Sequence, residues 1–126
     1  MAMDISKTEY QVLDALWKLA PCSANELIAE LNKSQDWHEK TVKTLLSRLL
    51  KKQAIAFTKR GREYIYSPCI SKKDYQGQES QSFIKRLFKG KVSPLVAAFA
   101  ENESLSKEDI AELKQLIDSW EETNND

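Results

Sequence analysis

The sequence predicts a mainly α-helical chain with one small β-hairpin, and three observations support this fold class. Apolar residues recur at helical spacing in three segments before residue 52. Two short runs rich in β-branched and aromatic residues then flank a glycine. After Pro68 the helical spacing returns and continues through Trp120. We therefore expect three helices, a hairpin and three further helices, in that order.

Capping boxes mark the starts of the first two helices. Residues 6–9 (S-K-T-E) and 23–26 (S-A-N-E) both place a serine three positions before a glutamate, so that each side chain can bond to the other's backbone N–H. Pro21 ends the first helix, because the residue before a proline is driven out of the helical conformation. The residues expected to face inward are Tyr10, Leu13, Leu16, Trp17 and Ala20 in the first helix and Leu27, Ile28 and Leu31 in the second.

The third helix, which residues 36–39 (D-W-H-E) can cap, carries a local excess of positive charge. Residues 40–62 contain eight Lys or Arg and no Asp or Glu, although the whole chain has a net charge of zero. That excess indicates an anionic partner, and the alternative is a basic helix face that only contacts solvent. The apolar face consists of Val42, Leu45, Leu46, Leu49 and Leu50.

Residues 55–59 and 63–67 predict a hairpin that turns at Arg60-Gly61-Arg62. Gly61 supplies the positive φ that a tight turn needs. Since a basic helix leads directly into a basic hairpin, the pattern is typical of the recognition helix and wing of a winged helix-turn-helix. We assign residues 1–70 to such a DNA-binding domain.

The polar face of the third helix mixes short hydroxyls with cations, which suits a DNA groove. Lys and Arg neutralise phosphates, while Thr, Ser and Arg also bond to base edges. A winged helix that docks an acidic protein through the same basic strip is the alternative function. The residues predicted to face the major groove are Thr41, Lys43, Thr44, Ser47 and Arg48, and those predicted to hold phosphates are Lys40, Lys51, Arg60 and Arg62.

Residues 71–126 predict a separate helical dimerisation domain. Three short amphipathic helices cannot bury their apolar stripes well alone, so a twofold dimer in which each tail packs on its twin is the economical arrangement. The alternative is a tail that folds back on its own N-terminal domain. The residues predicted to form the dimer contact are Phe83, Leu87, Leu95, Phe99, Ile110, Leu113, Ile117 and Trp120.

Composition argues against several other classes of protein. No run of about 18 apolar residues is present, so we expect no membrane insertion and a cytoplasmic protein. Two cysteines, Cys22 and Cys69, and a single histidine give no zinc spacing, and we expect no metal and no cofactor. A redox-sensitive pairing of the two cysteines is an open alternative. With only three glycines and no clustered acid pair or nucleophile with its base, an enzyme is the weakest hypothesis.

The chain resembles the BlaI/MecI penicillinase-repressor family, a group of winged-helix transcriptional regulators. The resemblance covers almost the whole sequence, and its most specific part is the run W-x-x-K-T-V-x-T-L-L-x-R-L. It rests on residues 9–13 (E-Y-Q-V-L), 16–17 (L-W), Trp37, 40–49 (K-T-V-K-T-L-L-S-R-L), Lys52, 61–62 (G-R), 64–68 (Y-I-Y-S-P), 82–83 (S-F), 95–99 (L-V-A-A-F) and 105–106 (L-S).

This resemblance implies a bacterial homodimeric repressor that binds double-stranded DNA at a dyad-symmetric operator and controls β-lactam-resistance or related genes. In the characterised members a membrane-bound sensor metalloprotease responds to a β-lactam, and the repressor is then cut in its dimerisation part. The segment cut in those members matches Ala98-Phe99 here. The family is cut between Asn and Phe, and this chain has Ala98 in place of the asparagine.

Overall fold

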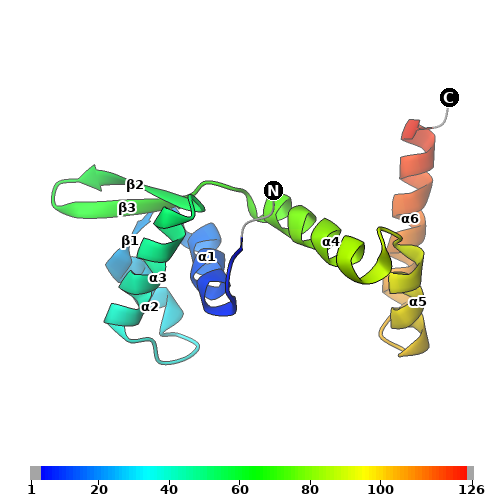
Figure 1. The fold of residues 1–126 in the computed structure, drawn as a ribbon, viewed down its shortest axis with the longest axis horizontal. Coiled ribbons are helices and arrows are strands. Elements are labelled where there is room, and N and C mark those ends of the chain that lie inside the picture. Colours follow the sequence, from blue (N-terminus) through cyan, green and yellow to red (C-terminus); the bar gives the residue numbers. More distant parts are fainter. Residues whose placement is uncertain (1–3, 125–126) are drawn as a thin grey trace. The chain divides into compact units, whose positions relative to one another are not determined.

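The computed structural model describes residues 4–124 and divides the chain into two compact units. We call residues 1–80 the head and residues 81–126 the tail. The order of three helices, hairpin and three helices is confirmed, with one additional short strand (Figure 1). The elements are α1 Lys7–Leu19, β1 Cys22–Ser23, α2 Ala24–Leu31, α3 Glu39–Lys51, β2 Ile55–Arg60, β3 Glu63–Pro68, α4 Lys72–Phe88, α5 Ser93–Glu101 and α6 Lys107–Asn124.

Both predicted capping boxes form. The Ser6 hydroxyl accepts the Glu9 N–H of α1 at 3.2 Å, and the Glu9 carboxylate accepts the Ser6 N–H at 2.8 Å. Ser23 and Glu26 make the same reciprocal pair at the start of α2. Each box satisfies two N–H groups that have no partner inside the helix, so both starting points are fixed by local sequence.

A single apolar cluster fills the head, and helices α1, α2 and α3 all contribute to it. In α1 the buried face differs from the expected stripe: Val12 and Ala15 are in the core, whereas Tyr10 and Trp17 lie half-buried at its edge. The fully buried apolar side chains, each less than 2% exposed, are Val12, Leu13, Leu16, Leu27, Val42, Leu46, Leu49 and Ala54.

The hairpin belongs to a three-stranded antiparallel sheet of order β1-β3-β2. Arg60 pairs with Glu63 across the turn, and Gly61 adopts the positive φ of 66° that the turn needs. Strand β1, which the sequence did not suggest, pairs Cys22 with Tyr66. This third strand ties the base of the wing to the start of α2.

The first turns of α4 pack against α1 within the head. The Trp17 indole N–H donates to the Ile70 carbonyl at 2.9 Å, and Lys72 forms a 3.1 Å ion pair with Asp14. Tyr75, only 6% exposed, lies with its ring centroid 5.8 Å from that of Tyr10 and 5.7 Å from that of Trp17. Burial, reinforced by a hydrogen bond with a glutamate one turn later, raises the pKa of the Tyr75 phenol. The compact head therefore extends to Ser80, past the expected boundary at residue 70.

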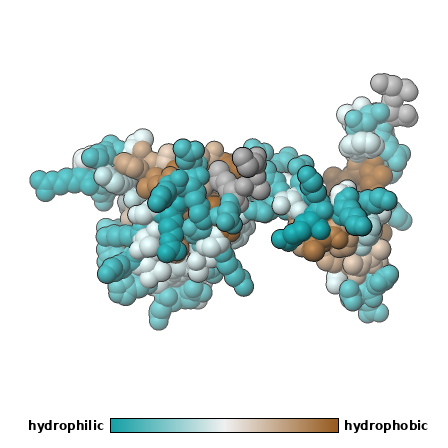
Figure 2. Space-filling model, in the orientation of Figure 1, coloured by the Kyte–Doolittle hydropathy of each residue, from teal (hydrophilic) through white to brown (hydrophobic). Residues whose placement is uncertain are grey.

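The tail contains three helical segments but no buried side chain among the residues described there. Helix α6 also begins at a local cap, since Ser106 and Asp109 form a reciprocal capping pair at 3.0 and 3.2 Å. Trp120 is 66% exposed and Leu87 is 57% exposed. Figure 2 shows apolar surface on the tail, over parts of α5 and α6. In the part of the chain that the structure describes, no helix is both long and apolar enough to span a membrane.

Candidate nucleic-acid interface

Helix α3 presents one face to solvent because its opposite face is locked into the core. Val42, Leu45, Leu46 and Leu49 are all buried, which fixes the rotation of the helix about its axis. The helix begins at the N-cap His38, whose Nδ1 accepts the Lys40 N–H at 3.1 Å. All nine predicted DNA contacts are exposed on α3 or the wing: Lys40, Thr41, Lys43, Thr44, Ser47, Arg48, Lys51, Arg60 and Arg62.

Lys43 forms an ion pair with Glu39 one turn earlier on α3. The Lys43 Nζ lies 2.7 Å from the Glu39 Oε1, and the two side chains are 56% and 60% exposed. The hydrogen bond from Lys43 holds the pKa of the Glu39 carboxyl below its usual range. Exposed helical pairs of this kind contribute only about 0.3–0.5 kcal/mol. Lys43 can therefore exchange Glu39 for a phosphate or a base edge at small cost.

Thr44 is oriented by a hydrogen bond to its own helix. Its Oγ1 donates to the Lys40 carbonyl at 2.9 Å, which leaves the hydroxyl lone pairs and the methyl group for a ligand. In the major groove, cytosine and adenine present amino donors and thymine presents a methyl group. Held in this way, the Thr44 hydroxyl can accept from an amino donor, and its proton is already used within the helix.

Three shallow concavities follow this surface, and they add residues that the sequence did not single out. The first, about 420 Å³, is lined from the N-cap His38 to Ser47. The second, about 400 Å³, brings Thr8 of α1 beside Arg48 of α3. The third, about 370 Å³, lies between the start of α2, Lys43 and the wing. Its lining includes Ser23, Ala24, Asn25, Lys43, Arg62, Glu63, Tyr64 and Tyr66.

Stacked aromatic rings stiffen the wing. Phe57 of β2 and Tyr64 of β3 have centroids 4.2 Å apart and planes inclined by 14°. The Lys59 Nζ lies 5.4 Å from the centroid of the Tyr64 ring, within cation–π range. Tyr66 continues the aromatic face toward the base of the wing, and burial raises the pKa of its phenol. These contacts support the hairpin whose turn carries Arg60 and Arg62.

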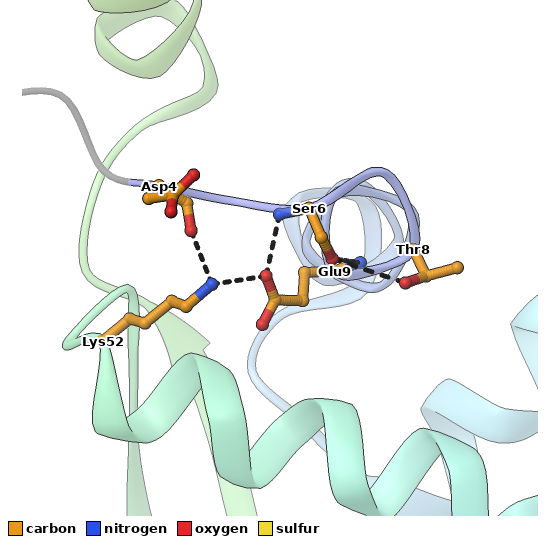
Figure 3. Close-up of polar contacts among 5 residues, drawn as sticks. All are labelled: Asp4, Ser6, Thr8, Glu9 and Lys52. Carbon is orange, nitrogen blue, oxygen red and sulfur yellow. Dashed lines mark hydrogen bonds and ion pairs between the residues drawn. The ribbon is translucent and has the colours of Figure 1, made fainter.

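Lys52 is the basic residue of the 40–62 stretch that turns toward the protein. Its Nζ donates to the Glu9 Oε1 at 2.6 Å and to the Asp4 carbonyl at 2.5 Å (Figure 3). Glu9 is 1% exposed, whereas the Lys52 side chain keeps 35% of its surface exposed. Its ammonium is therefore engaged at the junction of α1 and α3.

The described residues contain no group of three or more His, Cys, Asp or Glu side chains that could hold a metal ion. Cys22 and Cys69 are both free thiols, the first buried and the second exposed. Burial raises the pKa of the Cys22 thiol, and the nearby Glu26 carboxylate adds to the shift. Cys22 therefore behaves as a small apolar residue of the core.

The head combines a buried three-helix core, a basic helix with an exposed polar face and a basic wing. These features define a winged-helix DNA-binding protein. Residues 5–119 match the family described as penicillinase repressor. The penicillinase repressor of Bacillus licheniformis is 40% identical over 114 residues, which span 90% of this chain and 89% of that protein. The chain belongs to the penicillinase repressor family and is a DNA-binding repressor. The resemblance seen in the sequence is confirmed.

Two solved structures match the head. The solution structure of the DNA-binding domain of the repressor BlaI is 40% identical, with a TM-score of 0.53, and covers 60% of this chain and 92% of that one. The monomeric form of Bacillus licheniformis BlaI, solved in complex with the blaP half-operator, is 42% identical, with a TM-score of 0.50, and covers 57% of this chain and 88% of that one. The winged-helix fold of the head is thereby confirmed.

Proposed function

We propose that this protein is a homodimeric, sequence-specific transcriptional repressor of the bacterial cytoplasm that acts on a dyad-symmetric operator. The observation that carries the proposal is the exposed polar face of α3 between the fixed core and the basic wing. The BlaI structure with a bound half-operator shares the fold of the head and supports the same use of this surface. Occupation of a promoter by the dimer then blocks transcription sterically.

The two sets of residues on this surface have different tasks. Thr41, Lys43, Thr44, Ser47 and Arg48 form what we call the reading face, which enters the major groove and contacts base edges. Lys40 and Lys51 on α3 and Arg60 and Arg62 on the wing hold phosphates, which sets the register of the head on the duplex. Phosphate contacts supply affinity without sequence information, so the specificity comes from the reading face.

Dimerisation through the tail would place two heads on one operator. Each head alone makes few contacts, and two heads on one frame share the entropic cost of docking. The exposed apolar side chains of the tail fit this role, because a helical region without buried side chains needs a partner surface. The proposed contact consists of Phe83, Leu87, Leu95, Phe99, Ile110, Leu113, Ile117 and Trp120.

We further propose that a membrane sensor metalloprotease releases this repressor from DNA and so controls β-lactam-resistance genes. The bond between Ala98 and Phe99 lies inside α5, where the Ala98 carbonyl accepts both the backbone and the side-chain N–H of Asn102. A protease would need this helix to open locally before it could cut. Ala98 in place of asparagine removes the side chain that precedes the cut in the characterised relatives.

The test is fluorescence anisotropy on duplex DNA from upstream of the protein's own gene and on a shuffled duplex, between about 50 and 200 mM salt. We expect the native duplex to be preferred by on the order of 10³ at the higher salt. Equal affinity for both duplexes would contradict sequence-specific repression. Absence of binding at either salt would favour the alternative in which the basic strip docks an acidic protein.

Two arginine variants sharpen that test. Arg62→Ala should weaken binding to both duplexes alike and lower the salt slope by about 0.9, the contribution of one phosphate contact. Arg48→Ala should lower the preference for the native duplex by about five- to 150-fold, the scale of one mismatched base pair at 1–3 kcal/mol. If Arg48→Ala left affinity and preference unaltered, the assignment of the reading face would be wrong.

A further inference from the structure

Lys52 lies next to Lys51 in the basic stretch, but the two side chains have different surroundings. Lys51 ends α3 on its exposed face and has no ion pair with any residue between Asp4 and Asn124. The Lys52 ammonium instead lies between the Glu9 carboxylate and the Asp4 carbonyl (Figure 3). The sequence predicts a phosphate contact for Lys51 and gives no DNA-binding role to Lys52.

The carboxylate that Lys52 contacts is buried and has a second partner. The Glu9 Oε1 accepts from the Lys52 Nζ at 2.6 Å and from the Ser6 N–H at 2.8 Å. The capping box of α1 and the end of α3 therefore share one oxygen atom. Separating a buried carboxylate from its cation strongly destabilises a protein. The end of α3 therefore cannot easily move away from α1 at this junction.

The junction also reaches the reading face. The Lys52 N–H donates to the Arg48 carbonyl at 3.0 Å, so that a fixed Lys52 fixes the last turn of α3, from which Arg48 projects. On the α1 side, Thr8 lies between the two capping residues Ser6 and Glu9 and lines the same concavity as Arg48. One ion pair thus holds both walls of that concavity.

We propose that Lys52 is a positioning residue, whose ion pair with Glu9 fixes the last turn of α3 on α1 and so aligns Arg48 with the bases. Lys52 itself makes no phosphate contact. This inference rests on the proposed sequence-specific binding of DNA and adds two residues, Lys52 and Glu9, that act on specificity from behind the reading face.

The test compares two neighbouring lysines in the full-length protein on the native and shuffled duplexes. Lys52→Met should lower the preference for the native duplex by about tenfold, the scale of one mismatched base pair, and leave the salt slope unchanged. Lys51→Met, the matched control, should lower the slope by about 0.9 and leave the preference unchanged. Lys52→Arg, which keeps both the charge and the donors, should restore the preference.

Glu9→Gln gives a second measurement in case Lys52→Met does not fold. Gln keeps the acceptor for the Ser6 N–H but removes the charge that holds Lys52. The positioning role predicts the same loss of preference, whereas a phosphate-binding Lys52 would be released and would bind both duplexes as tightly or more tightly. Circular dichroism melts set a temperature at which each variant is folded.

The positioning role of Lys52 and the proposed repressor function would be contradicted by different results. A drop in the salt slope for Lys52→Met, or an unchanged preference in Glu9→Gln, would overturn the positioning role and leave the repressor assignment intact. A wild-type protein without any preference for the native duplex would overturn the proposed function and the positioning role together.

Discussion

The head and the tail differ in how much of their apolar surface they bury within the chain. The head forms a core in which eight apolar side chains are less than 2% exposed, whereas no side chain described in the tail is buried. Burying one large aliphatic side chain contributes about 1.5–3 kcal/mol. The head therefore contains the interactions that stabilise it, and the tail exposes side chains that become stabilising only when a partner covers them.

Two leucine variants test this difference most strongly. Leu46 of α3 is 1% exposed, and Leu116 of α6 is 66% exposed. Leu46→Ala should lower the free energy of unfolding by about 2–5 kcal/mol because it leaves a cavity in the core. Leu116→Ala, which lies outside the proposed dimer contact, should change it by less than about 0.5 kcal/mol. Urea unfolding followed by tryptophan fluorescence measures both, and similar losses would contradict the contrast.

Trp120 tests whether a second copy covers the tail. Trp120→Ala should weaken dimerisation by about 2 kcal/mol or more, roughly thirtyfold. The reason is that an aromatic side chain that is exposed in the single chain and buried in the interface contributes strongly to binding. Sedimentation equilibrium across protein concentrations measures the dissociation constant.

Glu121→Ala is the neighbouring control for Trp120, since Glu121 is exposed and lies outside the proposed contact. It should leave the dimer intact. A wild-type protein that stays monomeric at all concentrations would remove the basis for the two-headed repressor.

The features that the sequence could predict are those that depend on neighbouring residues. Local signals were sufficient for the helix starts at Ser6 and Ser23 and for the turn at Gly61, because each depends on residues a few positions apart. The exposure of the predicted DNA contacts followed from the apolar spacing of α3.

Contacts between distant segments were not predictable in this way. Strand β1 forms because Cys22 pairs with Tyr66. Tyr75 belongs to the head because its ring packs against those of Tyr10 and Trp17. The inward turn of Lys52 depends equally on Glu9, which is far away in the sequence. Periodicity gives the face of a helix, but it does not give the element that meets that face.

The last comparison concerns acid and separates the buried carboxylate of the head from exposed ones. Burial works to raise the pKa of Glu9, but the hydrogen bonds from Lys52 and Ser6 outweigh it and hold this pKa below the ordinary 4.5. A depressed folded-state pKa stabilises the protein above the unfolded pKa, and this stabilisation is lost as the pH falls through the folded value. Glu9→Gln should therefore cost about 1.5–3 kcal/mol near pH 7, the range for a hydrogen bond to a charged group.

The cost of Glu9→Gln should shrink steadily below about pH 4.5, because wild-type Glu9 becomes neutral there and then resembles the glutamine. Glu39 is the matched control, since its pKa is also lowered by a lysine, but its side chain is 60% exposed. Glu39→Gln should change the stability of the head little at any pH, because solvent screens this exposed pair. Urea unfolding between pH 3 and 7 measures both variants, and an equal cost for the two would show that burial of the Glu9–Lys52 pair adds nothing to the stability of the head.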